Sequence, residues 1–163
     1  MKIFIIGSGE CGKTEAKEII VSMTGLRAAD SSWFMAEKVV RPYLENKYKI
    51  KYQTIEECYQ DRRNYRELWL NAISEYNELD SATLAREIFK EHDIYAGIRS
   101  RREFLAAKEF SDLSIWIDAE KRVPKKDLSL DILKEDCDMI IDNNGTLKDF
   151  RSRVLRFCRF LCA

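Results

Sequence analysis

The chain has 163 residues, 45% hydrophobic and 34% charged, so it is long enough to bury a core and too apolar to be disordered. Its 28 basic side chains balance 28 acidic ones, which excludes an overall field that would attract nucleic acid or a membrane surface. The five cysteines have no paired CxxC spacing, which disfavours zinc and favours a reducing compartment. No run approaches the roughly 20 apolar residues of a membrane span, so we expect one cytoplasmic domain and no membrane partner.

The first residues predict a strand followed by a helix. Residues 2–6 form a continuous β-branched and aromatic run that ends at a glycine, which is typical of a strand buried on both faces of a parallel sheet. A helix is expected from Lys13 to about Met23, where apolar residues recur at helical spacing until Gly25 stops them. Residues 26–29 predict a short second strand.

The remainder of the chain predicts alternating helices and strands. Residues 33–92 are mostly helical by apolar spacing. Short apolar runs, separated by helical segments, follow at residues 94–98, 113–117 and 139–141, and an amphipathic helix closes the chain at residues 147–162. The alternation of strand and helix predicts an α/β fold with a parallel sheet.

The clearest motif lies between the first strand and the first helix. Residues 7–14, Gly-Ser-Gly-Glu-Cys-Gly-Lys-Thr, match G-x-x-x-x-G-K-[ST] in full and in the strand-to-helix context that this motif requires. Backbone N–H groups of such a loop face a polyphosphate, Lys13 reaches the β- and γ-phosphates, and the Thr14 hydroxyl ligates Mg²⁺. The predicted phosphate-binding residues are Gly7, Gly9, Glu10, Cys11, Gly12, Lys13 and Thr14.

The other motifs narrow the reaction. The sequence has neither the D-x-x-G nor the N-K-x-D motif expected of a GTPase, and no later predicted strand ends in the paired acids expected of an ATPase motor. Arginines lie instead at predicted strand ends and in loops, namely Arg62, Arg63, Arg99, Arg101, Arg102 and Arg122. Several guanidinium groups neutralise a phosphoryl group during transfer, so this set favours a kinase.

Three side chains join Lys13 as candidates for catalysis. Arg99 follows the third predicted strand, at the carboxyl edge where open α/β sheets bind their ligands. Arg122 lies in the charged stretch 119–127, where a mobile lid would bring it over the phosphates. Asp30 ends the second predicted strand, where its carboxylate would deprotonate an acceptor hydroxyl, help to hold hydrated Mg²⁺, or instead cap the next helix.

The acceptor is expected to bind between these strand ends and the helical region of residues 31–92. The candidate contacts are Asp30, Ser31, Arg62, Arg63, Arg99, Arg101 and Arg102. For each arginine taken singly, the alternative is a solvated surface residue.

Four segments together resemble a known family. They are the loop at 7–14, the segment 95–104, the segment 115–119 with Arg122 beyond it, and the segment 137–147. They resemble phage P-loop deoxynucleoside monophosphate kinases and, at least as closely, a related branch that phosphorylates 5-hydroxymethyluracil within phage DNA. The resemblance spans nearly the whole chain, and its specific motif is the P-loop.

The resemblance implies a nucleoside-monophosphate-kinase-like fold, with a five-stranded parallel sheet flanked by helices. It also implies ATP as phosphate donor, with Asn143 and Gly145, in the turn at residues 143–146, near the adenine. One departure concerns the D-G-x-x-R pattern common in monophosphate kinases, where this chain has Ala96 in place of the aspartate. The usual arrangement of magnesium and acceptor is therefore altered, which leaves Asp30 as the better candidate for the base.

Three functions remain open on the sequence. They are a kinase of a free deoxynucleotide, a kinase of a hydroxymethylated base in DNA, and a nucleotide-binding regulator with little or no hydrolysis. Neutral overall charge disfavours a DNA acceptor, whereas the arginines at 99–102 favour one. The segment 95–104 inclines the interpretation toward 5-hydroxymethyluracil in DNA, and the regulator ranks last because it gives the arginines no purpose. The oligomeric state is open.

Overall fold

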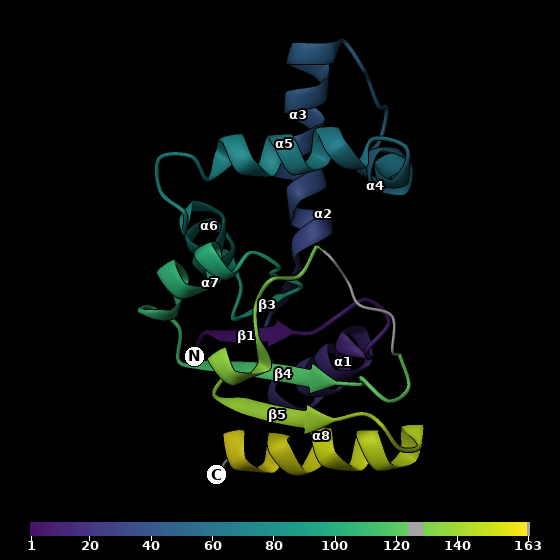
Figure 1. The fold of residues 1–163 in the computed structure, drawn as a ribbon, viewed down its shortest axis with the longest axis vertical. Coiled ribbons are helices and arrows are strands. Elements are labelled where there is room, and N and C mark those ends of the chain that lie inside the picture. The colour runs from purple at the N-terminus through teal and green to yellow at the C-terminus, as the bar shows by residue number, and fades with distance from the viewer. Residues whose placement is uncertain (124–128, 163) are drawn as a thin grey trace.

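A computed structural model describes residues 1–123 and 129–162 and has the five-stranded parallel sheet expected from the sequence (Figure 1). The strands are β1 (Ile3–Ile6), β2 (Ala28–Asp30), β3 (Ile94–Ala96), β4 (Leu113–Asp118) and β5 (Met139–Asp142). They lie in the order β2-β3-β1-β4-β5, and every neighbouring pair is parallel. The central strand β1 is fully buried, which explains its unbroken apolar sequence.

Side chains of β1 alternate between two hydrophobic clusters, one on each face of the sheet. Ile3 and Ile5 pack against α1 (Lys13–Thr24) and α8 (Leu147–Leu161). Phe4 and Ile6 belong to the cluster on the other face. That cluster includes apolar side chains of α6 (Thr83–Glu91) and α7 (Arg101–Lys108). Helices therefore cover both faces of the sheet.

A helical arm stands over the carboxyl edge of the sheet and corresponds to much of the predicted acceptor region (Figure 1). A continuous helix begins with α2 (Ser31–Met35), passes through a π-helical turn (Ala36–Val40) and α3 (Arg41–Tyr43), and ends in a second π-helical turn (Leu44–Tyr48). It is followed by α4 (Ile55–Gln60), a 3₁₀ turn (Asp61–Arg63) and α5 (Arg66–Tyr76), which crosses it. Pro42 has no N–H for the carbonyl of Lys38, which fits the widened turn there.

Two strands, β2 and β3, differ from their predicted bounds by two residues at one end, and these differences bear on the position of the site. β2 begins later than predicted and includes Asp30, which pairs with Ala96. β3 stops at Ala96 because Gly97 adopts φ 95°, outside the extended region, while its N–H donates to the carbonyl of Ile5 at 3.0 Å. The ends of β1, β2 and β3 therefore meet at one edge. A 3₁₀ turn (Lys134–Asp136) precedes β5.

The helices of the described chain include none that is both long enough and apolar enough to cross a lipid bilayer.

Candidate active site

The P-loop at residues 7–12 connects β1 to α1 in a conformation that requires its glycines. Gly7 and Gly12 have φ of 149° and 103°, and Glu10, with φ 61°, is also left-handed. A Cβ on Gly7 would lie 2.7 Å from Sγ of Cys11, and a Cβ on Gly12 would lie 2.5 Å from Nδ2 of Asn143. Any side chain at either position would therefore displace the loop or its support.

Lys13, the first residue of α1, folds back over this loop. Its Nζ donates hydrogen bonds to the carbonyl oxygens of Gly7 at 2.8 Å and Ser8 at 2.6 Å. Within the described chain, the backbone N–H groups of Ser8, Glu10 and Gly12 donate to no other residue. A cation, open amide donors and the positive end of α1 together fit a triphosphate.

Thr14 is the residue of this loop best suited to Mg²⁺, because its exposed hydroxyl lies in the first turn of α1. The described residues contain no group of three His, Cys, Asp or Glu side chains that could hold a metal ion. When bound, Mg²⁺ would be held by the Thr14 hydroxyl, by oxygen atoms of the nucleotide and by water.

Asn143 supports the P-loop from the turn after β5. Its side chain is only 6% exposed, and its Nδ2 donates to the carbonyl oxygen of Cys11 at 2.8 Å. Its backbone N–H donates to the carbonyl of Asp118 at 2.6 Å, which fixes the turn to the end of β4. Asn143 thus holds the loop in place, whereas Gly145, two residues later, is exposed. Contact of either residue with adenine stays a prediction.

Burial raises the pKa of the Cys11 thiol, although the nearby Lys13 opposes the shift. The side chain of Cys11 is fully buried. The thiol is therefore kept protonated and serves to pack the loop.

Arg122 reaches the P-loop from the turn after β4, as expected of a residue close to the phosphates. Its Nε donates to the carbonyl of Asn143 at 3.2 Å, and its Nη2 donates to the carbonyl of Glu10 at 3.2 Å. Residues 119–123 of the predicted lid form this turn, and the others, 124–127, lie outside the described residues. The catalytic role of Arg122 stays a prediction.

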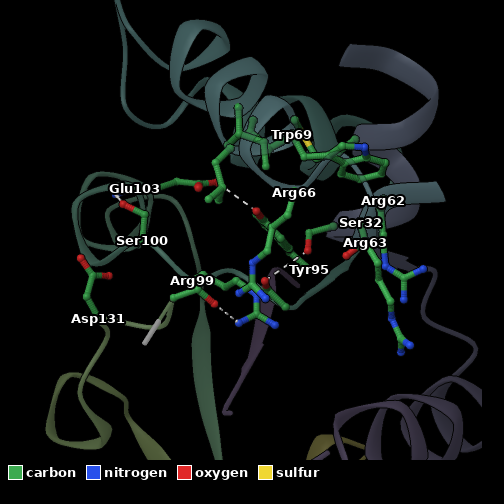
Figure 2. Close-up of a pocket in the computed structure, with 17 residues that line it drawn as sticks. Ser32, Arg62, Arg63, Arg66, Trp69, Tyr95, Arg99, Ser100, Glu103 and Asp131 are labelled. Carbon is green, nitrogen blue, oxygen red and sulfur yellow. Dashed lines mark hydrogen bonds between the residues drawn. The ribbon is translucent and has the colours of Figure 1, made fainter. Parts of the chain in front are cut away.

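A cavity of about 730 Å³ opens at the carboxyl ends of β2 and β3, below α5 (Figure 2). Its apolar lining consists of Met35, Trp69, Leu70, Ile73, Leu84 and Tyr95. Four arginines also line it, Arg62, Arg63, Arg66 and Arg99. Its volume is in the range typical of small-molecule sites. An aromatic and aliphatic lining beside four cations suits a ligand that has both a ring and an anionic group.

The four arginines differ in how firmly they are held. Arg62 lies over the ring of Tyr59, 4.1 Å from its centroid, and its Nη1 donates to the Tyr59 carbonyl at 2.8 Å. Arg99 donates from Nη1 to the hydroxyl of Ser129 at 2.7 Å. Arg63 and Arg66 have exposed side chains. Arg66 was missed by sequence reasoning, although its spacing of four from Arg62 in a helical region is a signal for a shared face.

No protein-family model and no curated protein sequence matches the chain. Solved structures do match it over nearly its full length. Dephospho-CoA kinase from Campylobacter jejuni is 17% identical with a TM-score of 0.54, and the match covers 99% of this chain and 98% of that one. Shikimate kinase from Bacteroides thetaiotaomicron is 12% identical with a TM-score of 0.53, covering 100% and 99%. The chain therefore shares its overall fold with these two kinases.

A sugar kinase from Janibacter sp. HTCC2649 also matches, with 16% identity, a TM-score of 0.49 and coverage of 97% of this chain and 94% of that one. The predicted five-stranded parallel sheet flanked by helices is confirmed.

Within this fold, two arginines predicted to bind the acceptor lie outside the cavity lining. Arg101 forms a two-point ion pair, in which its Nε and Nη2 each lie 2.7 Å from a carboxylate oxygen of Asp136. Hydrogen bonding by Arg101 lowers the pKa of Asp136 to about 2. Arg101 therefore ties α7 to the 3₁₀ turn before β5. Arg102 is exposed and does not line the cavity either, so the geometry gives no support to an acceptor role for this pair.

Asp30 and Ser31 are adjacent but face different hollows. Ser31 lines the large cavity, and its Oγ donates to the carbonyl of Gly97 at 3.1 Å. The carboxylate of Asp30 forms an ion pair with Lys17 of α1 and borders a smaller hollow of about 380 Å³. Asp30 precedes α2, but its side chain makes no capping hydrogen bond, so the capping alternative is wrong. Its role as the base stays a prediction.

Trp33 borders the same smaller hollow and is 41% exposed.

Glu103 is the lining residue that sequence reasoning missed most completely. It is only 5% exposed, and burial raises the pKa of its carboxyl group to about 7. Ser100 and Glu103 have the spacing of a helix capping box, which gave no reason to look for a site there. A signal was nevertheless present, because the preceding loop follows β3 at the ligand-binding edge.

Proposed function

We propose that this protein is an ATP-dependent kinase, using Mg²⁺, whose acceptor is a nucleoside monophosphate. The observation that carries the proposal is the cavity that joins an aromatic lining to four arginines at the sheet edge where the P-loop lies. Stacking and apolar contact with Trp69 and Tyr95 suit a base, and guanidinium groups suit its phosphate.

Separate residues would bind the phosphate donor and the acceptor. The P-loop amides and Lys13 would hold the triphosphate, and Thr14 would hold Mg²⁺. ATP, when bound, supplies the phosphoryl group, so that ADP and a nucleoside diphosphate are the products. Arg99 borders the acceptor cavity and Arg122 contacts the P-loop, so each is placed to offset negative charge on its own side of the transfer.

A monophosphate acceptor also accounts for the place of Asp30. The second pKa of a phosphate monoester is about 6, so the attacking oxygen is already ionised near neutral pH and no base has to remove a proton. Asp30 borders the smaller hollow, where it pairs with Lys17 and makes no contact with the large cavity. This arrangement suits a reaction that does not need it as a base.

The second candidate acceptor is the hydroxymethyl group of 5-hydroxymethyluracil in DNA. It is favoured by the exposed side chains of Arg63 and Arg66, which would reach DNA phosphates flanking an extruded base. A hydroxyl group must lose its proton to attack, so this candidate assigns Asp30 the role of base, with Arg62, Arg63 and Arg99 on the acceptor.

The test is transfer from labelled ATP to a panel of nucleoside monophosphates and of normal and hydroxymethylated DNA. We expect a labelled nucleoside diphosphate from at least one monophosphate, with an acceptor KM that changes little with salt. Labelled DNA, with an affinity that falls steeply as salt rises, would instead establish the second candidate. ATP binding without transfer to any acceptor would leave the regulator as the function and contradict the proposal.

The acceptor arginines have a matched control in the same chain. Arg66→Ala, on the cavity lining, is expected to raise the acceptor KM about tenfold or more, because a charge-assisted contact is lost. Arg102→Ala removes an exposed arginine outside the lining and should leave KM unchanged. Equal effects of the two variants would mean that this cavity is not where the acceptor binds.

A further inference from the structure

Three described helices begin with a hydroxyl residue followed three positions later by an acid. The pairs are Thr54 with Glu57 in α4, Thr146 with Asp149 in α8, and Ser100 with Glu103 in α7. In α4 and α8 the exchange is complete, because the acid accepts a hydrogen bond from the backbone N–H of the capping residue. In α7 only one of the two hydrogen bonds forms. The Ser100 hydroxyl accepts from the Glu103 N–H at 3.3 Å, but the Glu103 carboxyl group does not accept from the Ser100 N–H.

The carboxyl group of Glu103 turns into the acceptor cavity instead. Its Oε1 accepts a hydrogen bond from the hydroxyl of Tyr95 at 3.0 Å, and both residues line the cavity. Figure 2 shows the carboxyl group of Glu103 directed toward the middle of the cavity, on the side opposite Arg62 and Arg63. Across the described chain, no other side chain donates to this carboxyl group.

This placement costs stability, because an ionisable group is withdrawn from water and a helix cap is left incomplete. An apolar residue at position 103 would avoid the first cost, and a carboxyl group turned to the Ser100 N–H would avoid the second. A cost of this kind at a cavity wall is typical of a group that serves a ligand.

We propose that the carboxyl group of Glu103 accepts a hydrogen bond from a ring N–H or amino group of the acceptor's base, and thereby selects a nucleobase over a bare sugar phosphate. The proposal rests on the proposed function, since it concerns the acceptor of that same cavity. With the base against Trp69 and Tyr95 and its phosphate at the arginines, the base edge would face Glu103. Carboxylates accept from base amino groups in this way elsewhere.

Selectivity follows from the burial of this carboxyl group. A ligand without a donor would leave the second oxygen of Glu103 without a hydrogen bond from the ligand on a largely buried side chain, and sites built around such a bond reject ligands that lack it. Ribose 5-phosphate keeps the sugar and the anion but has no base, so it isolates the contribution of the base.

The experiment measures binding of nucleoside monophosphates and of ribose 5-phosphate by calorimetry, without ATP, to the full-length protein. We expect the wild type to bind at least one monophosphate about tenfold or more tightly than ribose 5-phosphate. Glu103→Met, which has similar length and no acceptor, should remove that preference and leave the affinity for ribose 5-phosphate unchanged. Glu103→Gln keeps an acceptor oxygen without the charge and should give an intermediate preference.

A pH series separates recognition by the carboxylate from a general effect on packing. The affinity of ribose 5-phosphate, measured over the same pH range, gives the effect of ionising the ligand's phosphate. In the wild type, the affinity for the monophosphate should rise from pH 6 to pH 8 by more than the affinity for ribose 5-phosphate does. In Glu103→Gln this additional rise should disappear. Glu57→Gln, a change at the same position of α4, should behave as the wild type.

Two results would overturn the inference. The first is that ribose 5-phosphate, in the wild type, binds as tightly as every monophosphate in the panel, which includes the case in which none binds. The second is that Glu103→Met keeps the wild-type preference. Because ATP is omitted, a protein that selects a monophosphate through Glu103 but transfers no phosphate would contradict the kinase and leave this inference intact.

Discussion

The side-chain amide of Asn143 donates a hydrogen bond to the backbone carbonyl of Cys11 at 2.8 Å, which joins the turn after β5 to the middle of the P-loop. The same turn receives the side chain of Arg122, which also contacts the carbonyl of Glu10. The buried Asn143 therefore supports the phosphate-binding loop, and the cationic side chain of Arg122 lies beside it. Its shape depends on residues more than a hundred positions away.

Replacing Asn143 with leucine should loosen the P-loop. Leucine has a similar size but no donor, so the carbonyl of Cys11 would be left unsatisfied in a buried position. We expect a loss of about 1–3 kcal/mol in the free energy of unfolding, measured with urea, together with weaker ATP binding. Asn71→Ala, at an exposed position of α5, is the control and should change stability by less than about 0.5 kcal/mol. An Asn143→Leu protein as stable as the control would refute this support role.

Two glycines with positive φ give opposite predictions for alanine. At Gly12 the new Cβ would lie 2.5 Å from Nδ2 of Asn143 and 3.2 Å from the ring of Phe150, so the loop has to move and ATP affinity should fall more than tenfold. At Gly25, the residue after α1, φ is 72° and nothing lies within 4 Å of the new Cβ. Gly25→Ala should cost about 1–2 kcal/mol of stability and leave ATP affinity unchanged.

Equal ATP affinities for these two alanine variants, measured by calorimetry, would mean that the close contact at Gly12 does not shape the nucleotide site.

The P-loop and the sheet could be predicted because their signals are local. A buried strand, three glycines and Lys13 lie within a dozen residues, and β1, β3 and β5 each contain an unbroken apolar run. The end of β3 could not be predicted in this way. The apolar run continues to Ile98, whereas the positive φ of Gly97 ends the strand at Ala96, so β3 was predicted two residues too long.

The acceptor residues could not be predicted as well because their neighbours are distant in sequence. Arg101 follows Arg99 by two residues, yet it pairs with Asp136 and does not line the cavity. Nothing in the sequence near position 101 indicates this pairing. Glu103 matches a capping pattern that two other helices obey, and only the position of Tyr95 reveals the exception. Partners of this kind are fixed by tertiary packing.

Asp30→Asn distinguishes the two acceptor candidates. If the acceptor is a monophosphate, its oxygen needs no base, and transfer should fall less than about tenfold through loss of the ion pair with Lys17. If the acceptor is a hydroxyl group, removal of the base should lower transfer about 100-fold or more at unchanged ATP affinity. Initial rates with each acceptor measure the difference. Lys17→Ala removes the same ion pair while keeping the carboxylate, and it controls for the structural part of the effect.

Burial of Glu103 predicts an unusual dependence of stability on pH. The folded protein holds the proton up to a pKa of about 7, above the ordinary value of 4.5. Between these values the folded state binds more protons than the unfolded state, so the contribution of Glu103 to stability falls as pH rises from about 4.5 to about 7. From pH 4.5 to pH 7, the free energy of unfolding of the wild type should therefore fall by about 3 kcal/mol relative to that of Glu103→Gln.

Urea unfolding at several pH values measures this shift, and taking the difference from Glu103→Gln cancels the other titrating groups. Asp149 is the acid of the complete capping box in α8. Relative to Asp149→Asn, the wild type should not lose stability as pH rises. A difference between wild type and Glu103→Gln that does not vary with pH would mean that Glu103 is solvated in the folded protein.

We propose that Lys13 and the P-loop hold ATP for transfer to an acceptor in the arginine-lined cavity. The most direct measurement is the initial rate of labelled phosphate transfer from ATP with Mg²⁺ to nucleoside monophosphates, for wild type, Lys13→Ala and the exposed control Lys90→Ala. We expect a labelled nucleoside diphosphate with wild type and Lys90→Ala, and a rate at least about 100-fold lower with a folded Lys13→Ala. Equal rates for Lys13→Ala and wild type, or no transfer by the wild type, would rule out this role of Lys13 and the cavity.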